Sequence, residues 1–543
     1  MLNAKIMTNL LNTNNGWRII SLRNALALLF LAILAGILAY IRVSNGDFFF
    51  SDTGQLYSML ENIHAGRGPI NQILPTLSAF QFYPDLGAME PSILCGMDYT
   101  SPHYEPEQYN HFRFHLYSIL YPASLLLFLF KTPFAAHGLN IFSFLLFLFI
   151  AYKIARKNGI PVLAAVVTVI VIGLHPAWMW AIAGQPYVDR LFLPVGLLLF
   201  YFTDNRDKSL APIVAVLVIA ALIVEKTMLY SGGFLVVYSI LHYREYANKR
   251  DFLARLLLGV VVVMISFVVV KYYLDNPYWK GGNMPYTPAA IIDALKAIMA
   301  NERSFNGVIS LLLVNAPLLL LALLFRPKLF LIGLVMLIPN LLGTIGGAEK
   351  TGYVTHYHSL YFPFVVYVFI LGISGLFKRL ASSFIAIWIF SGYMLACAVF
   401  YLLVGFTDNQ KISFVNTASS RNYYARYFYN LSKDLSNYKR ITTLIEENIP
   451  LNATVTITEP VLPYVYKYQN VRYYPYDFEN ADFLIVTYEK DAGQIHYRGY
   501  SGYWGAQHSR TVNDCLEPRI KKAGYNIDSP IILSPTLALL KRH

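Results

Sequence analysis

Long apolar stretches alternate with short polar segments along most of this chain. A helix needs about 20 mainly apolar residues to cross a bilayer, and fewer where lysine or arginine side chains at its ends reach the interface. The first stretch, 24–42, follows Arg18 and Arg23 and lacks a small-residue cleavage site, which indicates an uncleaved first span. The pattern predicts about eleven spans: 24–42, 137–153, 160–178, 189–203, 209–225, 228–243, 253–273, 305–325, 329–346, 359–377 and 383–405.

Clusters of lysine and arginine predict the orientation of these spans, because positive residues mark cytoplasmic ends. The stretch 116–130 is short and contains Pro122, and a crossing there would force the basic cluster 153–157 outside. We therefore expect an interfacial or re-entrant helix at 116–130. The alternation then predicts an inner-membrane protein with a cytoplasmic N-terminus, a long outer loop at 43–115 and an extracytoplasmic C-terminus.

The composition changes from apolar to polar and tyrosine-rich near residue 407. The segment 423–448 has helical spacing, and short β-type runs follow it. We predict two domains: a transmembrane domain over 1–406 and an extracytoplasmic α/β domain over 407–543. The predicted strands are 454–458, 471–474, 483–488 and 531–533.

The overall composition excludes a soluble protein. Hydrophobic residues make up 56% and charged residues 14%, against roughly 45–50% and 25% in soluble domains. The net charge of +12 comes from short basic clusters between apolar runs, a pattern of membrane topology and not of a nucleic-acid surface. The three cysteines lack CxxC or Cys/His spacing, so no zinc site is indicated, and a pairing of Cys95 with Cys515 stays open. Nothing resembles a Walker A loop, which disfavours ATP-driven transport by this chain alone.

Ionisable and polar residues gather at the predicted outer ends of the spans. Such residues are costly near a bilayer and tend to be functional or paired. The sequence yields one catalytic candidate and ten substrate-binding candidates. The catalytic candidate is Asp52, and the others are Gln55, His111, His115, Tyr187, Asp189, Arg190, Glu225, Lys226, His356 and His358.

Each candidate also has a structural interpretation. Asp52 precedes an amphipathic run and suits a helix N-cap as well as a catalytic carboxylate. Asp189 and Arg190 can pair with other helices, and the adjacent Glu225 and Lys226 point about 100° apart on a helix, so they do not simply neutralise each other. The motif HYH at 356–358 is no metal motif by itself. The cofactor is unknown, and a divalent metal ion stays open.

Seven blocks of the chain together form a recognisable pattern: FSDTGQLYSMLENIHAGRGP, HFRFHLYSILYPASLLLFLF, VDRLFLPVGLLLFYF, VEKTMLYSGGFLVVYSIL, HYHSLYFPFVVYVFILGI, PLNATVTITEP and NADFLIVTYE. In this order they resemble the DUF2079 family of bacterial membrane proteins, which is itself similar to the GT-C superfamily of glycosyltransferases. The chain departs from the family pattern at Arg113 and Phe114, where the family has a proline close to the His-Phe pair, and at Glu225-Lys226, where it usually has Lys-Glu.

The resemblance implies a GT-C-like fold and transfer of a sugar from a polyprenyl-phosphate donor to an envelope acceptor. The superfamily places an acidic residue of the first outer loop at the reaction centre, which corresponds to Asp52. Lys226, Arg190 or the outer histidines would supply positive charge to the leaving phosphate. A transporter or flippase is the first alternative and needs charged residues through both leaflets. A non-catalytic envelope assembly protein is the second, and it would keep its acidic residues in structural salt bridges.

Overall fold

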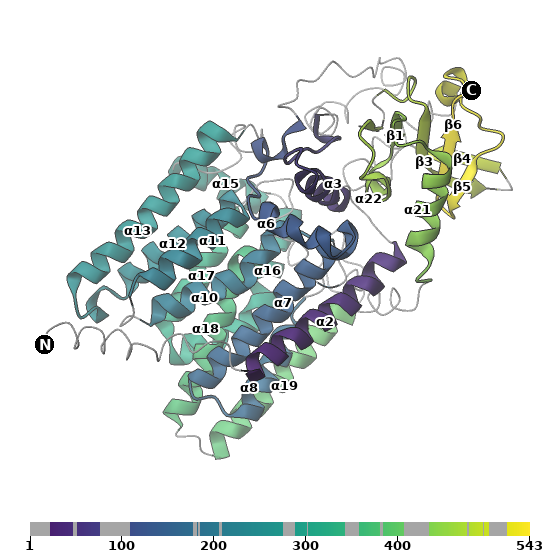
Figure 1. Cartoon of the computed structure of the whole chain (residues 1–543). Helices are drawn as coiled ribbons and strands as arrows, with labels where there is room; N and C mark the ends of the chain where they lie inside the picture. The colour runs from purple at the N-terminus through teal and green to yellow at the C-terminus, as the bar shows by residue number, and fades with distance from the viewer. Residues whose placement is uncertain are drawn as a thin grey trace, which may run out of the picture.

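The computed structural model describes residues 22–46, 52–75, 109–176, 182, 185–205, 209–274, 288–300, 302–342, 358–380, 384–406, 434–474, 477–491, 494–498 and 518–543. Within these ranges the protein is a bundle of helices with a β-sheet at one end (Figure 1). We call this end the sheet end and the other the far end.

Within the described residues, each predicted span coincides for most of its length with a helix. The bundle contains α2 (Leu22–Asn45), α7 (Thr132–Lys157), α8 (Val162–Leu174), α10 (Phe192–Asp204), α11 (Ala211–Ile223), α12 (Glu225–Leu241), α13 (Lys249–Val268), α16 (Glu302–Phe325), α17 (Pro327–Leu342), α18 (His358–Arg379) and α19 (Phe384–Phe406).

Six of the described helices are long and apolar enough to cross a membrane. They are α2, α7, α13 with the π-helical turn Val269–Tyr273 that continues it, α16, α18 and α19. Three shorter apolar helices, α8, α11 and α17, accompany them. The chain is therefore a helical membrane protein, while the number of crossings and the orientation of the termini stay predictions.

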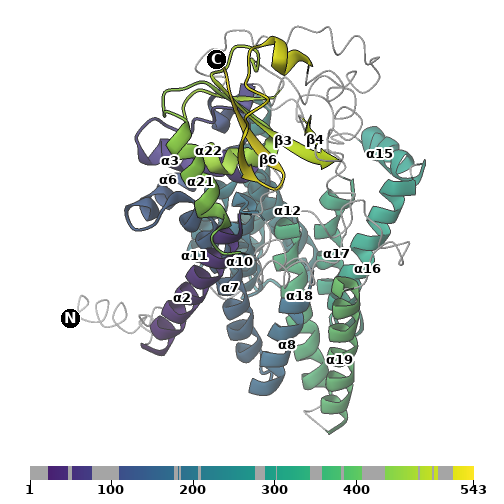
Figure 2. The ribbon, with the colours of Figure 1, turned by 90° about the vertical axis from the view of Figure 1, so that its right-hand side faces the viewer.

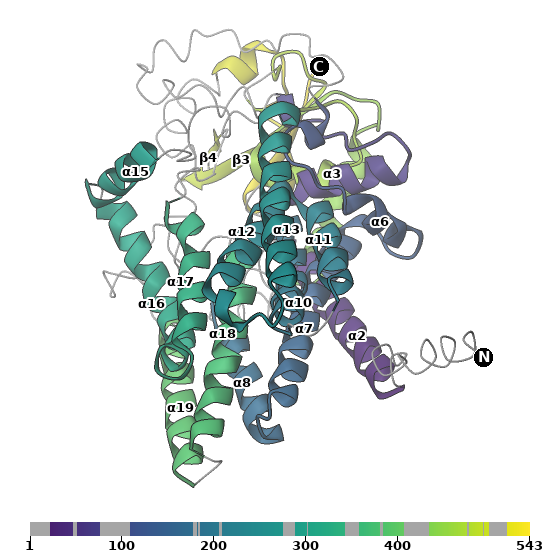
Figure 3. The same cartoon turned by 90° about the vertical axis from the view of Figure 1, so that its left-hand side faces the viewer.

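Helix α18 forms the centre of the bundle. Its residues from His358 to Phe377 are all buried, and it packs against α16, α10, α17 and α7. In contrast, α2, α13 and α19 expose large apolar side chains such as Leu29, Val261 and Trp388. Helix α13 lies along one side of the bundle in Figure 1 and at its front in Figure 3, and α2 and α19 lie on opposite sides of it in Figure 2. Their exposed apolar faces are suited to contact with lipid.

Short elements cover the sheet end of the bundle. They are α3 (Asp52–His64), the 3₁₀ turns η4 (His111–Arg113) and η6 (Val188–Leu191), and α6 (Leu120–Ser124) with η5 (Leu125–Phe128). The segment of α6 and η5 is too short to span a bilayer and exposes Leu125 and Phe128. The backbone N–H of Ile119 donates to the carbonyl oxygen of Leu222 at 2.6 Å, which fixes this segment to the end of α11.

A six-stranded mixed sheet follows in the C-terminal part. Its strand order is β2-β1-β3-β6-β5, with β4 paired to β3, and helix α21 (Asn437–Asn448) buries Ile441 and Ile445. The small helix α22 (Leu462–Val465) lies between β1 and β2 in the chain. The strands are β1 (Val455–Ile457), β2 (Val471–Tyr473), β3 (Phe483–Asp491), β4 (Gln494–Arg498), β5 (Ile531–Ser534) and β6 (Leu537–Lys541).

The four predicted strands are confirmed as β1, β2, β3 and β5. The sequence analysis missed β4 and β6, and β6 pairs with both β3 and β5. The first part of the predicted helix, 423–433, lies outside the described residues, as do Cys95 and Cys515. The described C-terminal part is therefore an α/β unit, and the domain boundary at 406 stays a prediction.

Candidate active site

Asp52 begins helix α3 and makes its hydrogen bonds with side chains. The Tyr187 hydroxyl donates to Asp52 Oδ2 at 2.9 Å, and Gln55 Nε2 donates to Asp52 Oδ1 at 3.2 Å. Among the described residues its carboxylate accepts no hydrogen bond from a backbone N–H. This arrangement does not support a role as helix cap alone.

A polar chain leads from Asp52 to the histidine motif. Asn71 Nδ2 donates to Gln55 Oε1 at 2.8 Å and lies 3.1 Å from His111 Nδ1. Tyr117 stacks on both His111 and His115, with ring centroids at 5.6 and 5.4 Å. Asn71 was missed by the sequence analysis, although it joins two predicted site residues.

His115 and Glu225 form a buried pair across the site. His115 Nδ1 lies 2.7 Å from Glu225 Oε1, and the backbone N–H of Leu116 donates to Glu225 Oε2 at 3.1 Å. The Glu225 side chain is fully buried, whereas that of His115 is 14% exposed. Glu225 thus fixes the orientation of the His115 ring and leaves its Nε2 for another partner.

Helix α7 holds the segment that carries Tyr187 and Arg190. Asn140 Nδ2 donates to the Tyr187 carbonyl oxygen at 2.8 Å, and the Ser143 hydroxyl donates to the Arg190 carbonyl oxygen at 3.0 Å. On the other side, the Thr53 hydroxyl donates to Gln185 Oε1 at 3.1 Å, which ties this segment to α3. A polar residue within a predicted span was the signal that could have identified Asn140.

Arg190 is the most unusual member of the site. Its side chain is 1% exposed, and its guanidinium lies 5.9 Å from the centre of the Tyr187 ring. Within the described part of the chain, its Nε and Nη2 atoms are buried and have no hydrogen-bond partner. These two atoms share one edge of the planar guanidinium, the edge that binds two oxygens of a phosphate or carboxylate.

Further charges lie around Arg190. Asp189 is 2% exposed and lies within electrostatic range of Lys226, His115, Glu225 and Arg190. Lys226 is itself 7% exposed. The structure therefore brings nine of the sequence candidates to one place at the sheet end: Asp52, Gln55, His111, His115, Tyr187, Asp189, Arg190, Glu225 and Lys226.

The surroundings change the acidity of two groups outside the spans. Solvent reaches the Asp52 side chain, yet the protein packed around it removes enough water to raise the pKa of this carboxyl, while the Tyr187 hydrogen bond and the nearby His115 oppose the change. Burial, with a smaller effect of His115, lowers the pKa of His111 to about 3. His111 is thus neutral at physiological pH.

Of the remaining two candidates, His358 has different partners. His358 begins α18, and its Nδ1 lies 2.6 Å from the hydroxyl of Tyr361, which also accepts from Asn315 Nδ2 at 2.9 Å. His356 lies outside the described residues. Among the residues that the structure describes, no group of three or more His, Cys, Asp or Glu side chains is placed to hold a metal ion, so the metal requirement stays open.

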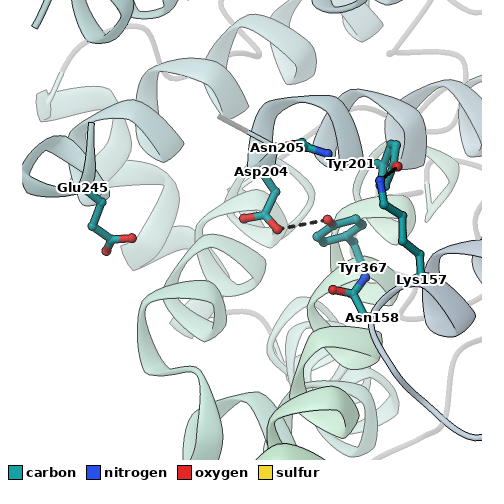
Figure 4. Close-up of a pocket in the computed structure, with 7 residues that line it drawn as sticks. All are labelled: Lys157, Asn158, Tyr201, Asp204, Asn205, Glu245 and Tyr367. Atoms are coloured by element: carbon teal, nitrogen blue, oxygen red, sulfur yellow. Dashed lines mark hydrogen bonds between the residues drawn. The ribbon is translucent and has the colours of Figure 1, made fainter. Parts of the chain in front are cut away.

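A second polar site lies at the far end, where α7 and α10 finish. It is a cavity of about 340 Å³ lined by Lys157, Asn158, Tyr201, Asp204, Asn205, Glu245 and Tyr367. Asp204 accepts a hydrogen bond from Tyr367 (Figure 4) and another from Tyr238, and Lys157 contacts Tyr201. Glu245 pairs with Lys328 at 2.6 Å. Because these charges already have partners in the protein, we assign no chemistry to this cavity.

Comparisons with known proteins gave structural similarities alone. No protein-family model matches the chain, and no curated protein matches it. Among solved structures, ArnT from Cupriavidus metallidurans is similar at 12% identity in the apo state, over 95% of this chain and 98% of that one, with a TM-score of 0.42.

The same ArnT bound to undecaprenyl phosphate gives 12% identity, 94% and 97% coverage and a TM-score of 0.43. An Archaeoglobus fulgidus oligosaccharyltransferase tethered with an acceptor peptide gives 12% identity, 88% and 74% coverage and a TM-score of 0.39. The membership in the DUF2079 family that the sequence motifs imply stays a prediction.

Proposed function

We propose that this protein is a membrane glycosyltransferase of the GT-C type, which transfers a sugar from a polyprenyl-phosphate donor to an envelope acceptor on the extracytoplasmic side. The observation that carries the proposal is the buried edge of Arg190, whose Nε and Nη2 have no partner in the described chain. Tyr187 connects this arginine to Asp52, because its ring lies 5.9 Å from the guanidinium and its hydroxyl donates to the Asp52 carboxylate. A charged group without hydrogen bonds is costly in free energy in the interior of a protein. The oxygens of a bound phosphate group would accept hydrogen bonds from both nitrogen atoms and so remove this cost.

The roles follow from the charges of the site. Asp52 positions the acceptor hydroxyl and takes its proton as the hydroxyl oxygen attacks the anomeric carbon of the sugar. The bond from that carbon to the phosphate oxygen then breaks, and the polyprenyl phosphate leaves with the electron pair. Arg190 and Lys226 stabilise the negative charge of this leaving group, and His115, oriented by Glu225, contributes a further N–H group.

The donor would keep its prenyl chain in the bilayer. The segment of α6 and η5 exposes apolar side chains next to the site, and its start is bound to the end of α11 through Ile119. This lipid-exposed border suits a substrate whose tail never leaves the membrane.

The centre of the bundle favours an enzyme over a transporter. Transport of a charged precursor needs a polar path through both leaflets, but Val365, Val366 and Phe369 in the middle of α18 are fully buried in the main hydrophobic core. A non-catalytic assembly protein would pair its buried charges within the protein. Arg190 departs from this expectation, because its buried Nε and Nη2 atoms have no hydrogen-bond partner in the described chain.

Two substitutions test the proposal by separating binding from transfer. Arg190→Gln removes the guanidinium and should weaken binding of a polyprenyl phosphate by on the order of tenfold or more, since a charge-assisted hydrogen bond contributes about 1.5–3 kcal/mol. Asp52→Asn should leave this binding intact and lower transfer by about 10²-fold or more. Binding is measured as the ligand-induced rise in melting temperature of the purified protein, and transfer as labelled sugar moved from lipid-linked donors in membranes.

The matched control for the first variant is Arg244→Gln, at an exposed arginine in the 3₁₀ turn η7 (Tyr243–Glu245). It should bind the polyprenyl phosphate like the native protein. Equal binding by Arg190→Gln and the control would refute the phosphate site, and full transfer by Asp52→Asn would refute the catalytic role.

A further inference from the structure

The segment before Asp52 is attached to the C-terminal sheet unit by two polar contacts. Asn437 Nδ2, at the start of α21, donates to the carbonyl oxygen of Asn45 at 2.9 Å. The Tyr464 hydroxyl of α22 donates to the carbonyl oxygen of Gly46, whose φ of 62° lies in the left-handed region. The C-terminal unit thus holds Asn45, the last residue of α2, and Gly46, which lie seven and six residues before Asp52.

A second attachment lies two residues after Asp52. A Cβ atom at Gly54 would lie 2.5 Å from Leu462 Cγ, 2.6 Å from the Leu462 carbonyl carbon and 2.7 Å from Pro463 N. Two of these atoms belong to the backbone, so a rotamer change cannot relieve the overlap. Helix α22 therefore lies directly on the first turn of α3, and only glycine at position 54 permits this distance.

Apolar side chains continue the contact along α3. Tyr57, which is fully buried, meets the ring of Tyr466 edge-on with centroids 5.4 Å apart. On another side of the helix, the Thr132 hydroxyl at the start of α7 donates to the Glu61 carboxylate. Helix α3 lies beside α22 in two views (Figures 1 and 2), and on its other side it contacts α6 and α7 of the bundle.

We propose that the C-terminal α/β unit is a positioning element for the reaction centre, which places the Asp52 carboxylate by pressing α22 onto the first turn of α3. The inference rests on the proposed role of Asp52 and goes beyond it, because it makes Gly54, Tyr464 and Asn437 positioning residues for a site that they do not touch. A carboxylate displaced by about 1 Å loses on the order of 10²-fold in rate, so contacts at both flanks of Asp52 have a direct catalytic consequence.

The test compares Gly54→Ala with Gly36→Ala in the full-length protein. Both glycines lie within helices, but a Cβ at Gly36 in α2 would meet nothing within 4 Å. Gly54→Ala should accelerate hydrogen exchange of the α3 amides by at least about tenfold, because the docked helix loses protection. It should also lower kcat of transfer by about 10²-fold while KM for the lipid-linked donor stays near its native value. Gly36→Ala should change neither quantity.

A milder variant covers the case in which Gly54→Ala does not accumulate. Tyr464→Phe removes only the hydroxyl that donates to Gly46 and keeps the ring, which stacks on Tyr438 at 5.4 Å. It should raise α3 exchange and lower kcat in the same direction, by smaller factors. The matched control is Tyr243→Phe, at an exposed tyrosine of the far end.

The outcomes separate this inference from the proposed function. Native α3 exchange and native kcat in Gly54→Ala, or in Tyr464→Phe where the first variant does not accumulate, would overturn the positioning role. Faster α3 exchange with native kcat would overturn it as well. Full transfer by Asp52→Asn would instead overturn the proposed function. In that case, hydrogen exchange of the α3 amides alone would decide whether the sheet unit holds α3.

Discussion

Ionisation of Asp52 should set the lower pH limit of transfer. The folded protein raises the pKa of this carboxyl above its ordinary value of 3.8, mainly by burial. The active carboxylate form is therefore lost as pH falls through a value higher than 3.8. The measurement is the pH dependence of kcat/KM, in which the acid limb should lie above pH 3.8, and its position below that value would contradict the prediction.

The same shift predicts the stability of Asp52→Asn. A carboxyl whose pKa is raised in the folded state favours folding in its protonated form, and this contribution is lost as pH rises through the folded pKa. The neutral amide avoids the cost of the charge, so at pH 7 the melting temperature of Asp52→Asn should equal or exceed that of the native protein. At low pH, where Asp52 is protonated, the difference should disappear. A clear loss of stability at pH 7 would show that the carboxylate has a structural role.

At the scale of single residues, the sequence predicted the charged residues that the structure brings together, with the neutral Gln55 and Tyr187, and missed the other neutral ones. Asp52, His115 and Glu225 were predictable because a charged group at the end of a membrane helix needs a reason to be there. Asn71 and the Thr53–Gln185 contact were not, since uncharged polar side chains in loops cost little and have many uses. Asp189 accepts no hydrogen bond from Nε or Nη2 of its neighbour Arg190. This depends on the three-dimensional placement of the two side chains, which their adjacent positions in the sequence do not reveal.

At the scale of elements, two neighbouring glycines of α12 predict opposite effects. A Cβ at Gly232 would lie 2.7 Å from the carbonyl oxygen of Gly259 and 2.9 Å from Val263 N, both in α13, whereas a Cβ at Gly233 would meet nothing within 4 Å. Gly232→Ala should push the two helices apart and destabilise the protein by about 1–3 kcal/mol, as overpacking does. Gly233→Ala should be neutral or stabilising by up to about 1 kcal/mol, since alanine favours helix more than glycine.

Melting temperatures of the two purified variants test this pair. The movement should also reach the site, because the Ser266 hydroxyl of α13 donates to the Glu225 carbonyl oxygen at 2.9 Å. We therefore expect reduced transfer in Gly232→Ala and native transfer in Gly233→Ala. Equal melting temperatures would mean that α12 and α13 do not pack through these glycines.

Element boundaries show where sequence patterns lose information. Apolar runs located the spans, but α10 and α11 are shorter than the segments 189–203 and 209–225, because η6 and the extended Val224 separate the helices from their polar ends. Strand β6 has four buried residues in succession and so lacks the alternation that reveals a half-buried strand. Its place between β3 and β5 comes from pairing between distant parts of the chain.

At the scale of the whole molecule, the predicted orientation can be tested with reporter fusions. Fusions after Lys157, Arg250 and Lys378 should report the cytoplasm, because basic clusters end α7, begin α13 and end α18. A fusion after Phe406, the last residue of α19, should report the outside. Paired alkaline phosphatase and green fluorescent protein reporters give opposite signals at each position. A cytoplasmic signal after Phe406 would reverse the predicted side of the sheet unit.

The shortness of α8 and α11 has a consequence for the surrounding membrane. Each has 13 residues and is therefore about 20 Å long, against a hydrocarbon core of about 30 Å. If both helices cross the bilayer as predicted, lipids next to them must compress or tilt, at a cost of fractions of a kcal/mol per Å of mismatch. The thinned bilayer would bring the headgroup layer down toward the level of Glu225, directly after α11. The acyl-chain length of the lipids would then affect how readily the protein holds a lipid-borne phosphate near Arg190. Shorter-chain lipids form a thinner bilayer, so less elastic work is needed to keep the phosphate there.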